Sequence, residues 1–134
     1  MSAPTDLAAH CLADARSQLR KYKAIADGAL AQVDDAAFFA TADAEANSIA
    51  LLCKHVAGNM RSRWTDFLTS DGEKPDRRRD SEFEREPGDS REAIMARWEA
   101  GWALASAAFG ALAPADLLRT VTVRGEPHTV LQAL

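Results

Sequence analysis

The residues best suited to chemistry stand together in one short segment, CKHVAGNMRSRWTDF, which spans residues 53–67. If this segment is helical, a rotation of about 100° per residue places Asn59, Ser62 and Asp66 within about 40° of His55. Imidazole, amide, hydroxyl and carboxylate groups would then form one polar strip at the margin of an apolar face. Bundle proteins build ligand and metal sites from side chains on facing helices. The segment therefore predicts part of a binding site around His55.

Arg63 is the unexpected residue on this helix, because the same geometry places it about 20° from Val56, in the middle of the apolar face. A buried guanidinium must be paired or hydrogen-bonded, since an unpaired buried charge is very costly. Two alternatives follow: an ion pair with a loop carboxylate such as Asp80 or Glu82, or a fork that binds an anionic ligand. The adjacent Trp64 is expected in the core, with a ligand contact as the alternative.

His55 alone supports two interpretations, a hydrogen-bonded structural residue and a metal ligand. Metal sites need three or four donors, and the only other histidines are His10 and His128. Neither has a histidine partner at the helical i+3 or i+4 spacing that marks a metal motif. A Ser-His-Asp grouping, a glycine-rich phosphate loop and a paired-cysteine motif are likewise missing from the sequence.

The first two helices that would position these residues are predicted from periodicity and capping signals. A stripe of apolar residues indicates a helix from about Asp6 to Val33. The second helix is expected to open at Asn47 or Ser48, either of which can cap it, and to end near Gly72. Its predicted core face consists of Ile49, Leu52, Val56, Met60 and Phe67.

The third helix and the C-terminal segment follow from similar signals. Asp89 is expected to cap the third helix and Pro114 to stop it. Residues 118–123 alternate apolar and polar types and predict an extended segment that turns at residues 124–125. Pro127 then suits the first turn of another helix, which spans only the last eight residues. Three long helices and a stub are expected to leave an apolar groove open to a partner.

The connection DGEKPDRRRDSEFEREPGD, residues 71–89, is long, polar and dense in both charge signs. One interpretation is a solvated loop whose charges pair locally. The other is a loop that folds over the end of the bundle as a lid, since loops of this length in compact domains are often functional. The preceding connection contains Phe38 and Phe39, which are expected to close one end of the core.

Composition bounds the class of protein. A chain of 134 residues with 47% hydrophobic and 27% charged residues predicts one globular domain over residues 1–134. The net charge of −4 argues against a nucleic-acid partner, in spite of the three consecutive arginines at 77–79. Cys11 and Cys53 are expected to be free and buried, as in a reducing cytosol. Neither a signal peptide nor a membrane span is recognisable, so the expected location is cytoplasmic, without a membrane partner.

The segments NSIALLCKHVAGNMRSRWTDFLTSDGEKP and RRRDSEF resemble an uncharacterised branch of the DinB-like superfamily, the damage-inducible, YfiT-like bacterial bundles. The resemblance extends from the first helix to VTVRGEPHTVLQAL, which is nearly the whole chain. It implies an all-α, up-down-down-up four-helix bundle with a longer connection between the second and third helices. Relative to that family, the fourth helix is expected to be largely missing from this chain.

The resemblance also implies a chemistry. Many members of that superfamily hold a divalent metal with three histidines, of which one lies in the middle of the second helix and maps onto His55. The other two form an H-x-x-x-H pair on the fourth helix, and this pair is absent here. A zinc, nickel or iron site is therefore implied, which this chain does not complete alone. Characterised relatives include thiol-dependent transferases, in which the metal acts as a Lewis acid.

The function implied by the resemblance is a divalent-metal-dependent enzyme of the thiol-transferase or hydrolase type. His55 would be one metal ligand, and Asn59, Arg63 and Trp64 would lie near a small-molecule or thiol substrate. The alternative is a non-catalytic bundle that has lost the metal site and binds a partner helix or its own copy. A homo-oligomer, such as a dimer, is expected in either case.

Overall fold

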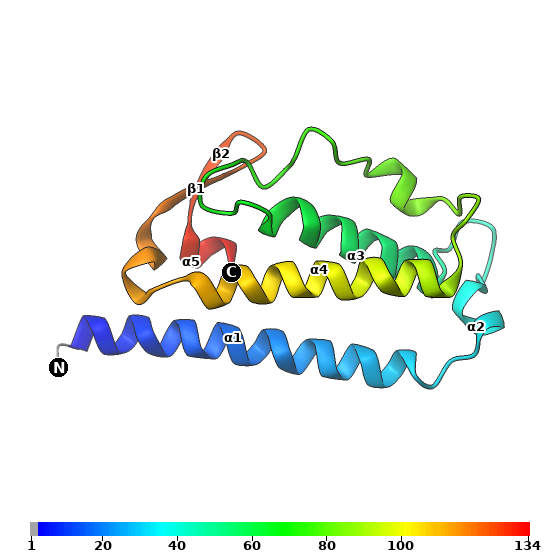
Figure 1. Ribbon diagram of the computed structural model, residues 1–134, viewed down its shortest axis with the longest axis horizontal. Coiled ribbons are helices and arrows are strands. Elements are labelled where there is room, and N and C mark those ends of the chain that lie inside the picture. Colours follow the sequence, from blue (N-terminus) through cyan, green and yellow to red (C-terminus); the bar gives the residue numbers. More distant parts are fainter. Residues whose placement is uncertain (1–2) are drawn as a thin grey trace.

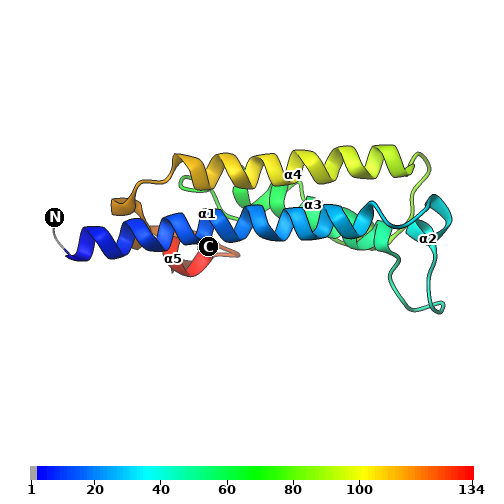
Figure 2. The ribbon, with the colours of Figure 1, turned by 90° about the horizontal axis from the view of Figure 1, so that it is seen from below.

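The computed structural model describes residues 3–134, in which three long helices dominate (Figures 1 and 2). They are α1 (Ala3–Leu30), α3 (Ile49–Trp64) and α4 (Arg91–Ala111). Figure 1 shows that α3 and α4 run in one direction and α1 in the other. This up-down-down order agrees with the first three helices of the expected bundle. The chain is thus mostly helical, whereas the four-helix bundle itself stays a prediction.

A small hairpin and several short helical turns complete the described chain. Strands β1 (Thr120–Val123) and β2 (Glu126–Thr129) pair antiparallel, with Thr120 opposite Thr129 and Val123 opposite Glu126. The two residues between the strands have positive φ angles, 53° at Arg124 and 76° at Gly125. This is the conformation that two-residue hairpin turns require. The predicted extended segment and its turn are therefore confirmed, and they add a two-stranded sheet to an expected all-α fold.

The remaining elements are short helical turns. They are α2 (Asp35–Phe39), the 3₁₀ turns η1 (Asp80–Phe83) and η2 (Pro114–Leu118), and α5 (Val130–Ala133). Phe38 on α2 is completely buried, as expected of a side chain that closes the core. Pro127 does not open the last helix, because it lies in β2 and Thr129 caps α5 instead.

The second predicted helix was too long at its C-terminal end. Ser48 caps α3 by accepting a hydrogen bond from Leu51 N, which confirms one of the two proposed caps. The helix ends at Trp64, and Asp66 has a left-handed φ of 48°. The amides of Thr69 and Ser70 then bond to Asp66 O in a tight turn. A left-handed residue ends a helix, so the boundary lies well before the glycine at position 72.

The predicted buried face was correct only in part: Phe67 is buried, and Ile49, Val56 and Met60 pack against the core as half-buried side chains. Leu52, however, is 49% exposed. The residues that α3 buries deeply are mainly small or polar: Ala50, Cys53, Lys54, Ala57, Ser62 and Trp64. The reason is the close approach of α4, where a Cβ at Gly101 would lie 3.2 Å from the Cα of Ala57. Two backbones this close accommodate only small side chains between them.

Hydrogen bonds at both ends of α4 hold this helix against α1. Arg16 donates to Phe109 O at 2.9 Å and Leu112 O at 2.7 Å, at the C-terminus of α4. Arg91 donates to Leu30 O and Val33 O, at the C-terminus of α1. Both arginines thus satisfy carbonyls that lack partners within the helix.

The core consists of two adjoining clusters. One joins the C-terminal half of α4 to the hairpin, and the other lies around α2 and the N-terminal half of α4. Their buried members include Leu12, Trp64, Phe67, Phe109, Val121 and Val130 in the first and Phe38, Ile94, Trp98 and Trp102 in the second. Within residues 3–134, none of the helices combines the length and the hydropathy needed to cross a membrane.

The contact between α3 and α4 is testable with two glycines of the same helix. Gly101→Ala is expected to lower the free energy of unfolding by about 1–2 kcal/mol, since the new Cβ presses on the backbone of Ala57. Gly110→Ala meets nothing within 4 Å, and should raise it by a few tenths to about 1 kcal/mol. Urea denaturation measures both values. Stabilisation by both substitutions would contradict the tight packing described.

Candidate functional site

The loop from 65 to 90 returns along α3 and is held there by a buried lysine (Figure 1). The side chain of Lys54 is 1% exposed, and its ammonium lies 2.6 Å from Asp89 Oδ2. It also donates to Ser81 O at 3.0 Å and Glu84 O at 2.7 Å.

The interpretation as a solvated loop with locally paired charges is confirmed in part, because most of residues 71–89 are exposed and Arg77 pairs with Glu73 and Glu82. The loop also packs along α3, however, rather than over the end of the bundle as a lid.

Asp89 therefore has a different role from the expected helix cap. Ser90 caps α4 by accepting from Ala93 N, whereas the carboxylate of Asp89 is buried against Lys54. Burial alone would raise the pKa of Asp89, but the hydrogen bonds from Lys54 and from Glu86 N outweigh it and hold this pKa below its usual range. The charged form is thus preferred, and the ion pair persists at neutral pH.

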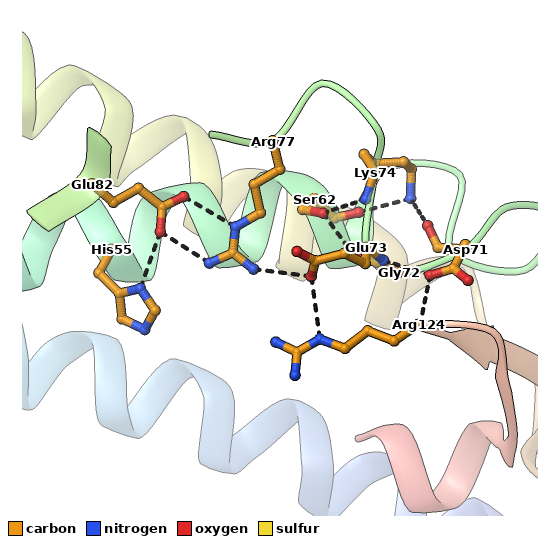
Figure 3. Close-up of polar contacts among 9 residues, drawn as sticks. All are labelled: His55, Ser62, Asp71, Gly72, Glu73, Lys74, Arg77, Glu82 and Arg124. Carbon is orange, nitrogen blue, oxygen red and sulfur yellow. Dashed lines mark hydrogen bonds and ion pairs between the residues drawn. The ribbon is translucent and has the colours of Figure 1, made fainter. Parts of the chain in front are cut away.

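Glu82 is the second buried anchor of the loop, and it reaches the centre of α3 (Figure 3). Arg77 binds it with two parallel hydrogen bonds, Nε to Oε2 and Nη2 to Oε1, each 3.0 Å long. The same Oε1 lies 3.0 Å from His55 Nδ1. A side chain at Gly58 would collide with this carboxylate. The glycine on α3 is therefore what lets the loop carboxylate approach the histidine.

The contact with Glu82 determines the state of the His55 ring. A carboxylate that is ion-paired with Arg77 accepts hydrogen bonds only, so Nδ1 of His55 carries the proton and donates. The second ring nitrogen, Nε2, then keeps its lone pair, and it points away from Glu82 toward the side where α1 runs (Figure 3). Phe83 packs on the ring at a centroid distance of 4.8 Å. His55, whose side chain is 28% exposed, is thereby held in one orientation.

Arg63 does not have the predicted partner. Glu82 is occupied by Arg77 and His55, and within residues 3–134 Arg63 forms no ion pair with Glu82 or Asp80. It is half-buried, with its guanidinium 6.0 Å from the centre of the Trp64 ring. The predicted salt bridge was wrong because the loop carboxylate binds nearer the middle of α3.

Asn59 and Arg63 instead line a cavity of about 390 Å³ between α3 and the hairpin. Its other lining residues are Gly72, Glu73, Val123, Arg124, Glu126 and His128. Asn59 and Arg63 follow His55 at intervals of four residues and therefore share its face of the helix. The structure thus brings three of the predicted site residues to one face and adds charged groups from the loop and the hairpin.

The walls of this cavity are joined by specific hydrogen bonds (Figure 3). Asp71 accepts from the amides of Arg124 and Gly125, each at 2.8 Å. Ser62 donates to Gly72 O at 2.8 Å and accepts from Lys74 N at the same distance. Ser62 is therefore a fully buried anchor of the loop rather than a member of a ligand-facing strip.

The charged groups around the cavity form a continuous chain that leads to His55 (Figure 3). Arg77 Nη1 lies 3.3 Å from Glu73 Oε2, and Arg124 Nε lies 3.6 Å from the same oxygen. The chain thus runs from Arg124 through Glu73 and Arg77 to Glu82. Displacing one member would change the position of the next.

The predicted site residue Trp64 lies elsewhere. Trp64 packs against Phe67 and Phe109 at centroid distances of 4.7 and 4.9 Å and does not line the cavity of Asn59 and Arg63. It has the core position expected of it, and a ligand contact by Trp64 stays a prediction.

Cys53 is a buried free thiol, and burial raises its pKa to about 11. It is therefore a packing residue rather than a nucleophile. Cys11 is also free, but only half-buried.

The described residues meet only part of the requirement for a metal site. His55 Nε2 has the lone pair, and Nδ1 has the carboxylate partner typical of metal-bound histidines. However, no group of three or more histidine, cysteine, aspartate or glutamate side chains among the described residues is placed to hold an ion. One imidazole is not a complete donor set, so these residues do not fit a metal by themselves.

Several residues of this site escaped the sequence analysis. Arg77, Glu73 and Arg124 belong to a loop and a turn, where no periodicity marks a face. Glu82 was considered only as a partner of Arg63, because a helical wheel does not show which residue a distant loop contacts. The useful signal was Gly58 in the middle of a helix, since such a glycine often marks a close approach.

These features define a mostly helical protein in which a long loop orients one histidine of the central helix. The family model described as "Protein of unknown function (DUF1572)" matches residues 6–134, and the chain belongs to this family. No curated protein and no solved structure matches the chain.

The orientation of His55 by Glu82 is directly testable. In the wild-type protein, ¹⁵N spectra of the imidazole should show a proton on Nδ1. Glu82→Ala removes the acceptor, so the proton should move toward Nε2 and the unfolding free energy should fall by about 3–5 kcal/mol, because Arg77 loses its main partner. Glu82→Gln retains an oxygen acceptor and should preserve the Nδ1–H form. The rings of His10 and His128 serve as internal controls, and an unchanged His55 spectrum in Glu82→Ala would contradict this role.

Proposed function

We propose that this chain is part of a divalent-metal-dependent enzyme of the thiol-transferase or hydrolase type with a DinB-like bundle fold. In this proposal His55 supplies one ligand through Nε2, and zinc, nickel or iron is the bound metal. The remaining donors come either from a second copy of the chain or from another polypeptide segment. The resemblance of CKHVAGNMRSRWTDF to the metal-binding helix of that superfamily motivates the proposal.

One observation carries this proposal: the hydrogen bond of 3.0 Å between Glu82 and His55 Nδ1. A catalytic histidine that must become positively charged benefits from an unneutralised carboxylate. Here the carboxylate is already bound in two places by Arg77, so its charge is shared and its position is fixed. A histidine whose Nδ1 is fixed by a carboxylate and whose Nε2 points away from it has the arrangement typical of metal-bound histidines.

The neighbouring cavity supports a small-molecule substrate on the same face. Its volume of about 390 Å³ lies within the usual range for ligand sites. Asn59 and Arg63 supply the polar groups that would bind this substrate, on the same face of α3 as His55.

Metal binding by His55 is the first test of the proposed function. Titration with Zn²⁺ or Ni²⁺, followed by ¹⁵N spectra of the histidine rings, should perturb Nε2 of His55 and leave its Nδ1 protonated. His55→Ala should weaken the affinity at least about tenfold, the size of effect seen when a ligand or its support is removed. His10→Ala, an exposed residue of α1, is the matched control. Equal weakening by both substitutions, or no response of His55, would contradict the proposal.

A second candidate function is a helical module that binds its own copy without catalysis. It is favoured by a cluster of exposed apolar side chains around α5, where two adjoining cavities of about 460 and 450 Å³ share Cys11 and Leu131. Leu118 is 77% exposed and Leu131 46% exposed at their rims. Exposed apolar surface of this kind is typical of interaction sites, and a second copy would cover it.

The oligomeric state tests this second candidate. Sedimentation velocity over a range of concentrations should reveal dimers, and the double substitution Leu118→Lys, Leu131→Lys should weaken association at least about tenfold by placing charges at the apolar contact. Thr122→Lys changes another exposed residue and should have little effect. A wild-type protein that stays monomeric at high concentration would exclude this interpretation.

A further inference from the structure

The cavity beside His55 contains charges of both signs that the protein leaves without partners. Arg63 on α3 and Glu126 on β2 both line it, yet within the described part of the chain neither forms an ion pair, with each other or with a third residue. Asn59 and His128, which also line the cavity, donate and accept no side-chain hydrogen bond among residues 3–134. A half-buried guanidinium without a carboxylate is unfavourable unless water or a ligand compensates it.

The other two charged residues that line the cavity already have oppositely charged neighbours. Arg124 lies 3.6 Å from Glu73, which also binds Arg77. The lining therefore contains two arginines and two glutamates, and its formal charge is zero. A dianion such as phosphate would find no net attraction in such a cavity. A ligand with one negative and one positive group would match the two free charges.

We infer that this cavity binds a small zwitterion of the amino-acid class. Arg63 and Asn59 bind its carboxylate, because a guanidinium fork and an amide N–H are both donors suited to two carboxylate oxygens. Glu126 binds its ammonium group. This assignment names the substrate class of the proposed enzyme and rests on that function, with the substrate bound beside His55 on the same face of α3.

The elements that carry Arg63 and Glu126 are joined by hydrogen bonds through the loop that lies between them. Gly72 joins the loop to β1 through a hydrogen bond of 2.8 Å to Thr122 O, and Asp71 fixes the turn that follows β1. Ser62 connects the same loop to α3. Arg63 and Glu126 therefore project from elements whose separation is determined by backbone contacts, so a ligand that spans them needs no large rearrangement.

Three matched probes test this inference: L-alanine, propionate and ethylamine, each titrated into the metal-free protein and followed by NMR of the Arg63 and Asn59 side chains. Alanine should bind most tightly. Arg63→Gln should weaken its binding at least about tenfold, as expected for the loss of a charge-assisted hydrogen bond. Glu126→Gln should weaken alanine but leave propionate unchanged. Arg61→Gln, two residues away on the same helix and facing Asp76, should alter neither.

Two outcomes would overturn the inference. Propionate binding as tightly as alanine, with no effect of Glu126→Gln, would define a simple carboxylate site. Absence of any change at Arg63 with all three probes would show that the cavity binds none of them. Because the titration is performed without metal, a failure of His55 to bind Zn²⁺ leaves this result unaffected. Conversely, His55-dependent metal binding without a response of Arg63 to alanine would refute only the substrate class.

Discussion

The buried carboxylate of Glu82 is the contact on which the geometry of this site depends. It lies between Arg77, which neutralises it, and His55, which it orients (Figure 3). Removing a buried carboxylate from water is unfavourable unless several hydrogen bonds compensate it, and here three are present. Gly58 provides the space for this arrangement, since any side chain there would collide with the carboxylate.

A second buried ion pair anchors the loop at Lys54, the residue of α3 that directly precedes His55. Lys54 binds Asp89 and two loop carbonyls. Two parallel helices need a connection that returns along their full length, and such a long segment would lose much conformational entropy on ordering. The buried pairs offset that cost, and they convert a polar connection into one wall of the site.

The arrangement separates the two faces of α3 by function. Small residues face α4, where Gly101 and Ala57 bring the backbones together. The opposite side presents His55, Asn59 and Arg63 with the hairpin, so the chemistry-bearing residues stay accessible while the helix remains packed. The proposed metal ligand, His55, and the proposed zwitterion-binding residues, Asn59 and Arg63, lie on this same face. The chain of charged residues from Arg124 to Glu82 connects the cavity to His55.

Local features of the fold were predictable from the sequence, because they depend on neighbouring residues. The three long helices, the cap at Ser48, the core position of Trp64 and the turn at Arg124 and Gly125 follow from periodicity, side-chain capping and turn preferences. The neighbourhood of His55 was predicted only in part. The tertiary structure decided which nitrogen of His55 faces a carboxylate and which residues Glu82 binds. It also decided that Arg63 forms no ion pair with Glu82. These properties depend on which loop carboxylate reaches α3, and that is determined by the backbone approach at Gly58 and by competition between Arg63 and Arg77 for one buried charge.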